Sequence, residues 1–325
     1  MFFRRTLSVM MLIACLPSFQ ATAAESFPTR QITIVNPYGP GGVTDVVVRA
    51  LAERLSDVWK QPVVIEYKPG ASTEVGAAYV AQSPPDGYTL LATDIATFMH
   101  PYLYPDEGVD PTKELIPVTG LGEVNHVLIT SPSFPAHSIA DLINLARAKP
   151  GALDYAIIGW GSPNHMSMEL LQKIAGVRLN PVYYKSGPQA ILDVMGGFIS
   201  MTFLSTTLTV PPAKAAKVQA LGVTSRERLP QLPNLPTIAE TVPGYEASWW
   251  YGLFAPLGTP PDIITTINTE AQKILVDPGF RAKVLDSNFY KPITGSAEEF
   301  ARQVESTSVR WKSVMHTATA PRPSK

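Results

Sequence analysis

A strand, a glycine-rich turn and a helix follow one another at two distant places in the chain, and this repeated unit constrains the fold more than any other feature. The first unit spans residues 32–60 and turns at Gly39–Gly42. The second spans residues 155–175 and turns at Gly159–Ser162. In both, a β-branched or apolar run precedes the turn and apolar residues with helical spacing follow it. Two units with one plan predict two α/β lobes.

The remaining elements continue this alternation. Strands are predicted at Ile32–Val35, Val63–Tyr67, Tyr88–Thr93, Tyr155–Ile158, Pro181–Tyr184, Ile199–Leu204, Val218–Val223 and Trp249–Ala255, and Ile116–Thr130 is predicted as two extended segments meeting near Glu123. Helices are predicted at Val43–Lys60, Val75–Gln82, Ser138–Lys149, Asn164–Ala175, Gln189–Met195, Thr259–Val276 and Ser296–Val314. The order at the start implies a parallel sheet, and the C-terminal helices need a sheet to cover.

The simplest packing returns those helices to the first lobe. This predicts one lobe from residues 25–124 and 246–325 and a second from 125–245, joined by two extended crossings with a cleft between them. The length of 325 residues agrees with two domains of roughly 100 to 200 residues each.

The charge balance excludes one class of protein. There are 26 Lys and Arg residues against 27 Asp and Glu, which gives a formal charge of -1, and no basic run is present. A protein that binds nucleic acid needs a basic face. We therefore expect no nucleic-acid partner.

The start of the chain has the pattern of a secretory signal peptide. Arg4 and Arg5 precede the apolar run Leu7–Leu16, and Ala21–Ala23 supplies the small residues of a cleavage site. The apolar run is about half of the ~20 residues needed to cross a bilayer. We therefore predict that residues 1–24 are removed and that the mature chain is a soluble protein of the periplasm.

The single cysteine, Cys15, lies inside this predicted signal peptide. Cleavage near Ala24 would leave a mature chain with no thiol, no disulfide and no cysteine-based metal site. An alternative stays open, because Leu12-Ile13-Ala14-Cys15 resembles a lipobox, in which Cys15 would carry a lipid and anchor the chain. Both interpretations predict export.

The motifs of the common enzyme classes are absent from the sequence. It has no Gly-x-Ser-x-Gly, no Gly-Lys-Ser/Thr, no Gly-x-Gly-x-x-Gly and no His-Glu-x-x-His. The five histidines, at 100, 126, 137, 165 and 316, show no metal-ligand spacing. We therefore predict no enzyme activity, no metal and no cofactor. For His165, which follows the second glycine turn, contact with a ligand and bracing of the loop both stay open.

The two glycine turns offer a binding mode for an anion. Such a unit aims backbone N–H groups and the positive end of a helix dipole at the space above the turn. A tight turn alone would also explain the glycines, but a second unit across the cleft favours a carboxylate held from both lobes. Asp45 is expected to orient the first turn through its N–H groups. The candidate ligand-binding residues are Tyr38, Gly41, Gly42, Val43, Thr44, Asp45, Ser72, Thr73, Thr93, Asp94, Trp160, Gly161, Ser162, His165, Tyr184, Ser205 and Thr206.

Several long motifs resemble those of a known family. They are PTRQITIVNPYGPGGVTD (28–45), QPVVIEYKPGA (61–71), PPDGYTLLAT (84–93), GSPNH (161–165), KAAKVQALGVTSRERLPQLPNLPTIAE (214–240) and YGLFAPLGTPP (251–261). In this order they resemble the Bug family, the periplasmic solute receptors of tripartite tricarboxylate transporters. The resemblance implies a two-lobed Venus-flytrap fold of the periplasmic-binding-protein type (type II-like). It also implies capture of a small carboxylate without catalysis and its delivery to a membrane permease. We further expect a monomer.

Four segments depart from the family pattern. Ser72-Thr73-Glu74 stands where Gly-Gly-Asn is common, and Trp160 stands where a small polar residue is usual. Tyr184–Gly187 replaces Tyr-Lys-Gly, and Leu204–Thr206 replaces Phe-Asp-Asn. The ligand's identity therefore stays open. Trp160 could stack on an aromatic or long apolar ligand, or fold back onto its own lobe.

Two rival functions are compatible with a two-lobed exported chain. A sensor subunit would pass its ligand state to a signalling partner instead of a permease, and the sequence does not separate this from transport. A secreted hydrolase would need a paired nucleophile and base, and the sequence motifs that supply such a pair are absent.

Overall fold

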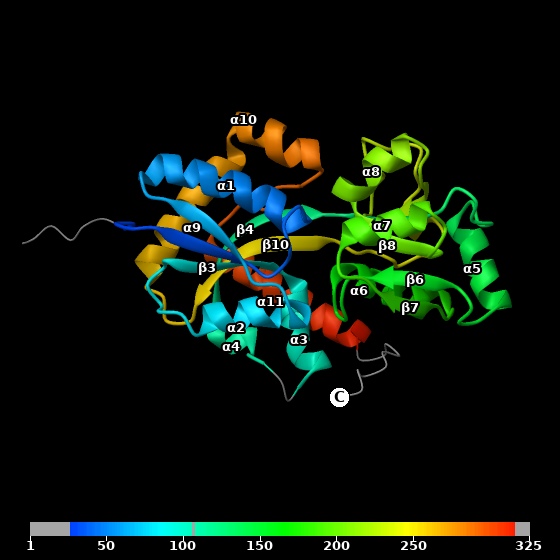
Figure 1. Ribbon diagram of the computed structural model, residues 1–325, viewed down its shortest axis with the longest axis horizontal. Coiled ribbons are helices and arrows are strands. Elements are labelled where there is room, and N and C mark those ends of the chain that lie inside the picture. The colour runs from blue at the N-terminus through cyan, green and yellow to red at the C-terminus, as the bar shows by residue number, and fades with distance from the viewer. Residues whose placement is uncertain (1–26, 106–107, 316–325) are drawn as a thin grey trace, which may run out of the picture.

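Residues 27–105 and 108–315 are described by a computed structural model of the chain, in which two lobes stand side by side (Figure 1). Each lobe is built on one five-stranded sheet. The two-lobed α/β architecture expected from the repeated unit is confirmed. The predicted signal peptide 1–24, with Cys15 and the cleavage pattern Ala21–Ala23, lies outside the described residues, and so does His316.

The first sheet is parallel on one side and antiparallel on the other. Its strands are β1 (Ile32–Asn36), β2 (Val63–Tyr67), β3 (Thr89–Asp94), β4 (Leu115–Val124) and β10 (Trp249–Pro256). They lie in the order β2-β1-β3-β10-β4. β1 pairs in parallel with β2 and β3, as the sequence predicts, whereas β10 runs antiparallel between β3 and β4. A strand that follows the second lobe in the chain therefore lies between two strands of the first lobe.

Helices cover both faces of this sheet. They are α1 (Val43–Trp59), α2 (Glu74–Ala81), α3 (Ile95–Leu103), α4 (Pro111–Glu114), α9 (Pro261–Val276), α10 (Pro278–Phe280) and α11 (Ala297–Met315). α1, α9 and α10 lie on one side and α2, α3 and α11 on the other (Figure 1). α1 buries Val47, Leu51 and Leu55, the helical spacing that its sequence predicts. α9 and α11 both contact β4, so the C-terminal helices pack on the first lobe as expected.

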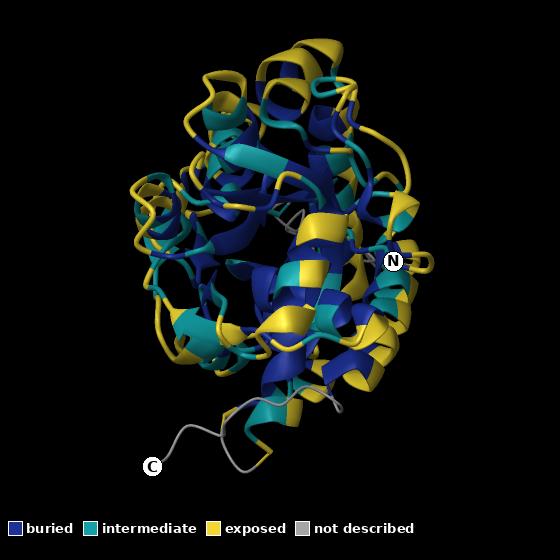
Figure 2. Cartoon of the chain, turned by 90° about the vertical axis from the view of Figure 1, so that its right-hand side faces the viewer, coloured by how far each residue is buried: buried dark blue, intermediate teal, exposed yellow. Residues whose placement is uncertain are grey.

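The second lobe repeats the plan, with the same arrangement of strands. Its strands are β5 (His126–Thr130), β6 (Asp154–Ile157), β7 (Asn180–Tyr183), β8 (Met201–Ser205) and β9 (Gln219–Val223), in the order β7-β6-β8-β5-β9. Its helices are α5 (Ile139–Ala148), α6 (Pro163–Ala175), α7 (Gly187–Met195) and α8 (Thr206–Lys214). Ser138 caps α5 as predicted, because its hydroxyl accepts a hydrogen bond from the Asp141 N–H at 3.1 Å. Buried residues concentrate along the strands and exposed ones on the outer surfaces (Figure 2).

The chain crosses between the lobes twice. Asn125 alone separates β4 from β5, and the return leads from the end of β9 at Val223 to Trp249. The two crossings are joined by backbone bonds, since Thr224 N–H donates to the His126 carbonyl at 2.9 Å. We propose that the first lobe comprises residues 25–124 and 246–325 and that the second comprises residues 125–245, as the sequence predicts.

Four helices were not expected from the sequence: the short α4 and α10, and the longer α3 and α8. α3 contains Pro101, and α8 contains Pro211 and Pro212, residues that usually end a helix. α3 buries the six residues Ile95–His100, and α8 buries Thr206, Thr209 and Val210. Tertiary packing therefore outweighs local propensity here. No helix within residues 27–105 and 108–315 is long and apolar enough to span a bilayer.

A close packing of helix on sheet generates the first prediction. Gly252 of β10 lies opposite Gly120 of β4, and a methyl group at position 252 would come within 2.2 Å of Cζ of Phe300 in α11. Gly252→Ala is expected to lower the free energy of unfolding by about 1–3 kcal/mol, because overpacking a dense core forces side chains to shift. Urea unfolding followed by circular dichroism measures this change.

The smaller side chain in Phe300→Leu supplies the control. The cost of Gly252→Ala should fall when it is combined with Phe300→Leu, since the two positions are in contact. If Gly252→Ala lowers the free energy of unfolding equally with Phe300 and with Leu at position 300, the steric clash with Phe300 is not the cause.

Candidate functional site

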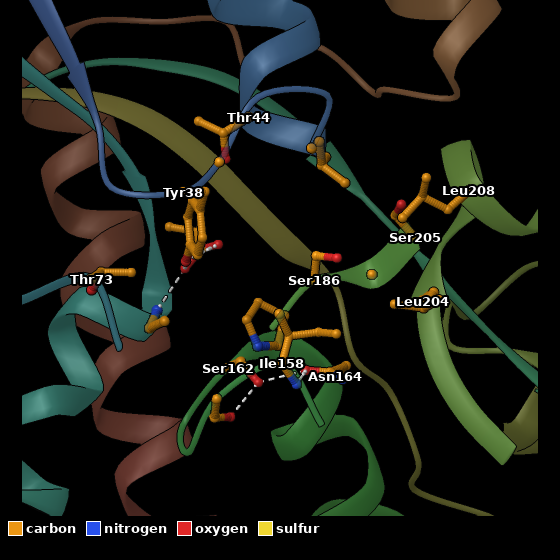
Figure 3. Close-up of a pocket in the computed structure, with 18 of the residues that line it drawn as sticks. Tyr38, Thr44, Thr73, Ile158, Ser162, Asn164, Ser186, Leu204, Ser205 and Leu208 are labelled. Carbon is orange, nitrogen blue, oxygen red and sulfur yellow. Dashed lines mark hydrogen bonds between the residues drawn. The ribbon is translucent and has the colours of Figure 1, made fainter. Parts of the chain in front are cut away.

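A cavity of about 420 Å³ lies between the two lobes. In Figure 3, Tyr38 and Thr44 face Ser205 and Leu208 across it. The first lobe lines it with Tyr38, Gly39, Pro40, Gly42, Val43, Thr44, Ser72, Thr73, Asp94, Ala96 and Tyr251. The second lobe lines it with His126, Ile158, Gly159, Trp160, Ser162, Pro163, Asn164, Lys185, Ser186, Gly187, Pro188, Leu204, Ser205 and Leu208. The volume suits a small organic molecule.

Three helices begin at the cavity wall without a capping side chain. The residues before α1, α6 and α8 are Gly42, Ser162 and Ser205, and none of them accepts a capping hydrogen bond through its side chain. The Ser205 hydroxyl is buried and has no hydrogen-bond partner among the described residues. Free N–H groups and positive dipole ends therefore meet at this cavity, an arrangement that favours an anion.

The first glycine turn is held by Asp45, which lies behind the cavity wall. Its carboxylate accepts hydrogen bonds from the Gly41 N–H at 2.9 Å and from the Tyr67 hydroxyl at 2.7 Å, and Arg49 lies 3.1 Å away. Burial opposes ionisation of Asp45, but these hydrogen bonds outweigh it and lower the pKa of the carboxyl. The predicted role of Asp45 in orienting the turn is thus present in the structure.

The second glycine turn is held by His165. The Gly161 N–H donates to its Nδ1 at 3.0 Å, and the ring is fully buried. Burial lowers the pKa of His165 to about 3, so the imidazole is neutral at pH 7. Of the two open interpretations, the structure places His165 in the bracing role. Trp160 meets this ring edge to face, with centroids 5.0 Å apart, and also lines the cavity.

Asp94 is a buried carboxylate on the cavity wall. It ends β3, and its Oδ1 accepts the capping hydrogen bond from the Ala96 N–H at 2.8 Å. The Tyr38 hydroxyl lies 2.9 Å from each of its oxygens. Burial raises the pKa of Asp94 to about 6 against the lowering effect of these hydrogen bonds. At neutral pH the wall therefore carries a desolvated negative charge.

The structure brings part of the predicted set to one cavity. The residues that line it are Tyr38, Gly42, Val43, Thr44, Ser72, Thr73, Asp94, Trp160, Ser162 and Ser205. Contact of these residues with a ligand stays a prediction. The residues that do not line it are Gly41, Asp45, Thr93, Gly161, His165, Tyr184 and Thr206.

Internal contacts explain four of these exclusions. The Thr93 hydroxyl pairs with that of Thr97 at 2.6 Å. Tyr184 donates to Asp193 at 2.9 Å and so faces α7. Gly161 faces α3 of the other lobe, and Thr206 is buried with its N–H donating to the Asn125 carbonyl.

Sequence reasoning missed several wall residues. His126 was set aside with the other histidines, yet it is buried at the first crossing and lines the cavity. Burial lowers the pKa of His126 to about 3, so it is neutral. Tyr251, which lies on β10, also lines the cavity. So do Lys185–Pro188, which follow β7, whereas the sequence predicted only Tyr184 from this segment. Ser186, which precedes α7, and Gly187, which begins it, were the signal for that segment.

The lobes touch at the rims of the cavity. A methyl group at Gly161 would lie 2.5 Å from Cδ1 of Leu103 in α3, which shows how closely the second turn approaches the first lobe. The Thr207 hydroxyl of α8 donates to the Asn288 carbonyl at 2.7 Å. In the described conformation the two lobes are therefore in direct contact beside the cavity.

Comparison with known proteins identifies this architecture. Residues 47–319 match the family described as "Tripartite tricarboxylate transporter family receptor". The chain belongs to this family. The resemblance to the Bug receptors is thereby confirmed. Protein BugT of Bordetella pertussis is 33% identical over 274 residues, which cover 81% of this chain and 84% of BugT.

Solved structures of similar proteins have the same fold. Rpa4515 of R. palustris, solved with adipate, is 35% identical, with a TM-score of 0.82 over 90% of this chain and 98% of that one. MatC of Rhodopseudomonas palustris, solved with bound malate, is 28% identical, with a TM-score of 0.82 over 89% and 99% of the two chains. Family, fold and cleft architecture therefore agree.

The buried charge of Asp94 predicts an effect on stability. Its pKa is about 6 in the fold against an ordinary value of 3.8, so the folded protein binds this proton more readily than the unfolded chain does. The resulting stabilisation is complete below about pH 4 and is lost as pH rises through 6. Asp94→Asn keeps a capping oxygen, and we expect it to be more stable than wild type by about 1–3 kcal/mol at pH 8.

The comparison is made by thermal unfolding between pH 4 and pH 8. The advantage of Asp94→Asn should vanish near pH 4, and Asp57→Asn, at an exposed position of α1, should show no such pH dependence. If Asp94→Asn is less stable than wild type at pH 8, the protein compensates the cost of burying the ionised Asp94 carboxylate, and this prediction is wrong.

Proposed function

We propose that this receptor binds one small carboxylate per chain in the cavity between its lobes and delivers it to a membrane permease. The observation that carries the proposal is the convergence of three uncapped helix N-termini, at Gly42, Ser162 and Ser205, on one cavity. Backbone N–H groups and hydroxyls bind a carboxylate with charge-assisted hydrogen bonds. The relatives solved with adipate and with malate support this class of ligand.

The proposal includes export to the periplasm, a monomeric chain and no catalytic turnover. A hydrolase would need an accessible nucleophile next to a base. Ser167 lies 3.5 Å from His126, but it is fully buried and donates to the Pro163 carbonyl at 2.8 Å. Among the described residues, no group of three or more His, Cys, Asp and Glu is placed to hold a metal ion. A sensor that uses the same cavity is the second candidate, supported by the same lobe contacts.

A ligand panel tests the carboxylate proposal. We expect at least one mono- or dicarboxylate to bind with a submillimolar dissociation constant in calorimetry. It should stabilise the fold by about 2.7 kcal/mol at a hundredfold excess over that constant. Recovery of the ligand unchanged, followed by NMR, tests the absence of turnover. Binding of a neutral sugar but of no carboxylate would reject the proposal.

Loss of the loop anchor should weaken binding. Asp45→Ala removes the acceptor of the Gly41 N–H, so the first turn loses its order, at a cost of about 1–2 kcal/mol in binding free energy. Asp57→Ala in the same helix is the matched control, because it removes an exposed carboxylate. Unchanged or tighter carboxylate binding by Asp45→Ala would show that Asp45 does not organise the site.

A further inference from the structure

We infer that Asp94 selects a ligand that carries a cationic amino group in addition to its carboxylate. The inference rests on the proposed carboxylate function and narrows it to zwitterionic ligands. It follows from the position of Asp94, from its free hydrogen-bonding capacity and from the charges around it.

Asp94 presents acceptor capacity to the cavity. The two oxygens of a carboxylate accept about four hydrogen bonds. The described donors are the Ala96 N–H and the single hydroxyl proton of Tyr38, which lies equally far from both oxygens. The backbone bond fixes the carboxylate at the end of β3, so it cannot turn away from the wall. A ligand donor can therefore bind here without displacing a protein contact.

The carboxylate has no cationic partner. No Lys, Arg or His side chain forms an ion pair with Asp94 among the residues that the structure describes. The cavity wall contains Lys185, but this residue is exposed and belongs to the second lobe. The nearby ionisable groups are Tyr38 and Tyr251, and burial raises the pKa of both, so both are neutral. A ligand ammonium would supply the missing positive charge.

The cavity has polar groups on two opposite sides. Tyr38, which contacts Asp94, and Ser205 at the start of α8 lie on opposite sides of it (Figure 3). Leu204 and Leu208 offer an apolar surface near Ser205. A ligand with its carboxylate toward the helix N-termini and an ammonium group toward Asp94 matches both ends. A second carboxylate at Asp94 would meet a like charge in a desolvated place.

Matched pairs of ligands test the inference by calorimetry at pH 8, where Asp94 is ionised. The pairs share their methylene count and differ only in one end: β-alanine with succinate, 4-aminobutyrate with glutarate, and 5-aminopentanoate with adipate. For the length that fits, we expect the amino acid to bind at least about tenfold tighter than the dicarboxylate. In Asp94→Asn this ratio should fall to about one or invert.

Asp57→Asn, an exposed carboxylate on α1, is the control and should leave the ratio unchanged. Thermal unfolding verifies that each variant is folded. A ratio near one in wild type, or the same ratio in Asp94→Asn, would overturn the role of Asp94 and leave the carboxylate function standing. Failure of every ligand in the wider carboxylate panel would instead reject the proposed function itself.

Discussion

The parallel strands of both lobes end at the same space, and the rest of the site depends on this constraint. β1 and β3 end at Asn36 and Asp94 in one lobe, and β6 and β8 end at Ile157 and Ser205 in the other. Each of these strands is followed, at once or after a glycine turn, by a helix whose N-terminus lies at the cavity wall; β6, for example, leads through Gly159–Ser162 to α6. Anion binding then requires no buried arginine, since the backbone itself supplies the donors.

Local patterns allowed the sequence to predict the two glycine turns, since strand, turn and helix lie next to one another in the chain. Which residues of a turn line the cavity was less predictable. Tyr184 was chosen where Lys185–Gly187 line the cavity, because its hydroxyl finds Asp193 on α7. Tyr251 and His126 were not identifiable as wall residues, since only the pairing of β10 with β3 and the first crossing bring them there. α8 was missed because Pro211 and Pro212 argue against a helix.

Asp45 and Asp94 show how environment separates two carboxylates in one lobe. Asp45 has Arg49, Tyr67 and a backbone N–H as partners, and its pKa lies below the ordinary value. Asp94 lacks a cation, and burial raises its pKa. The first carboxylate is therefore part of the support of the loop. The second is a charge that the fold holds at a cost in stability, and sites with such a cost are commonly functional.

One group of aromatic side chains lies at both crossings between the lobes and reaches the cavity. Trp249, at the start of β10, stacks on Trp311 of α11 with ring centroids 4.5 Å apart. His126 packs against the indole of Trp249, with centroids 5.7 Å apart. His126 and Trp249 stand at the lobe ends of the two crossings, so rotation of one lobe against the other must move or shear this stack. His126 also lines the cavity. A ligand that occupies the cavity therefore lies beside the segment at which the chain crosses between the lobes.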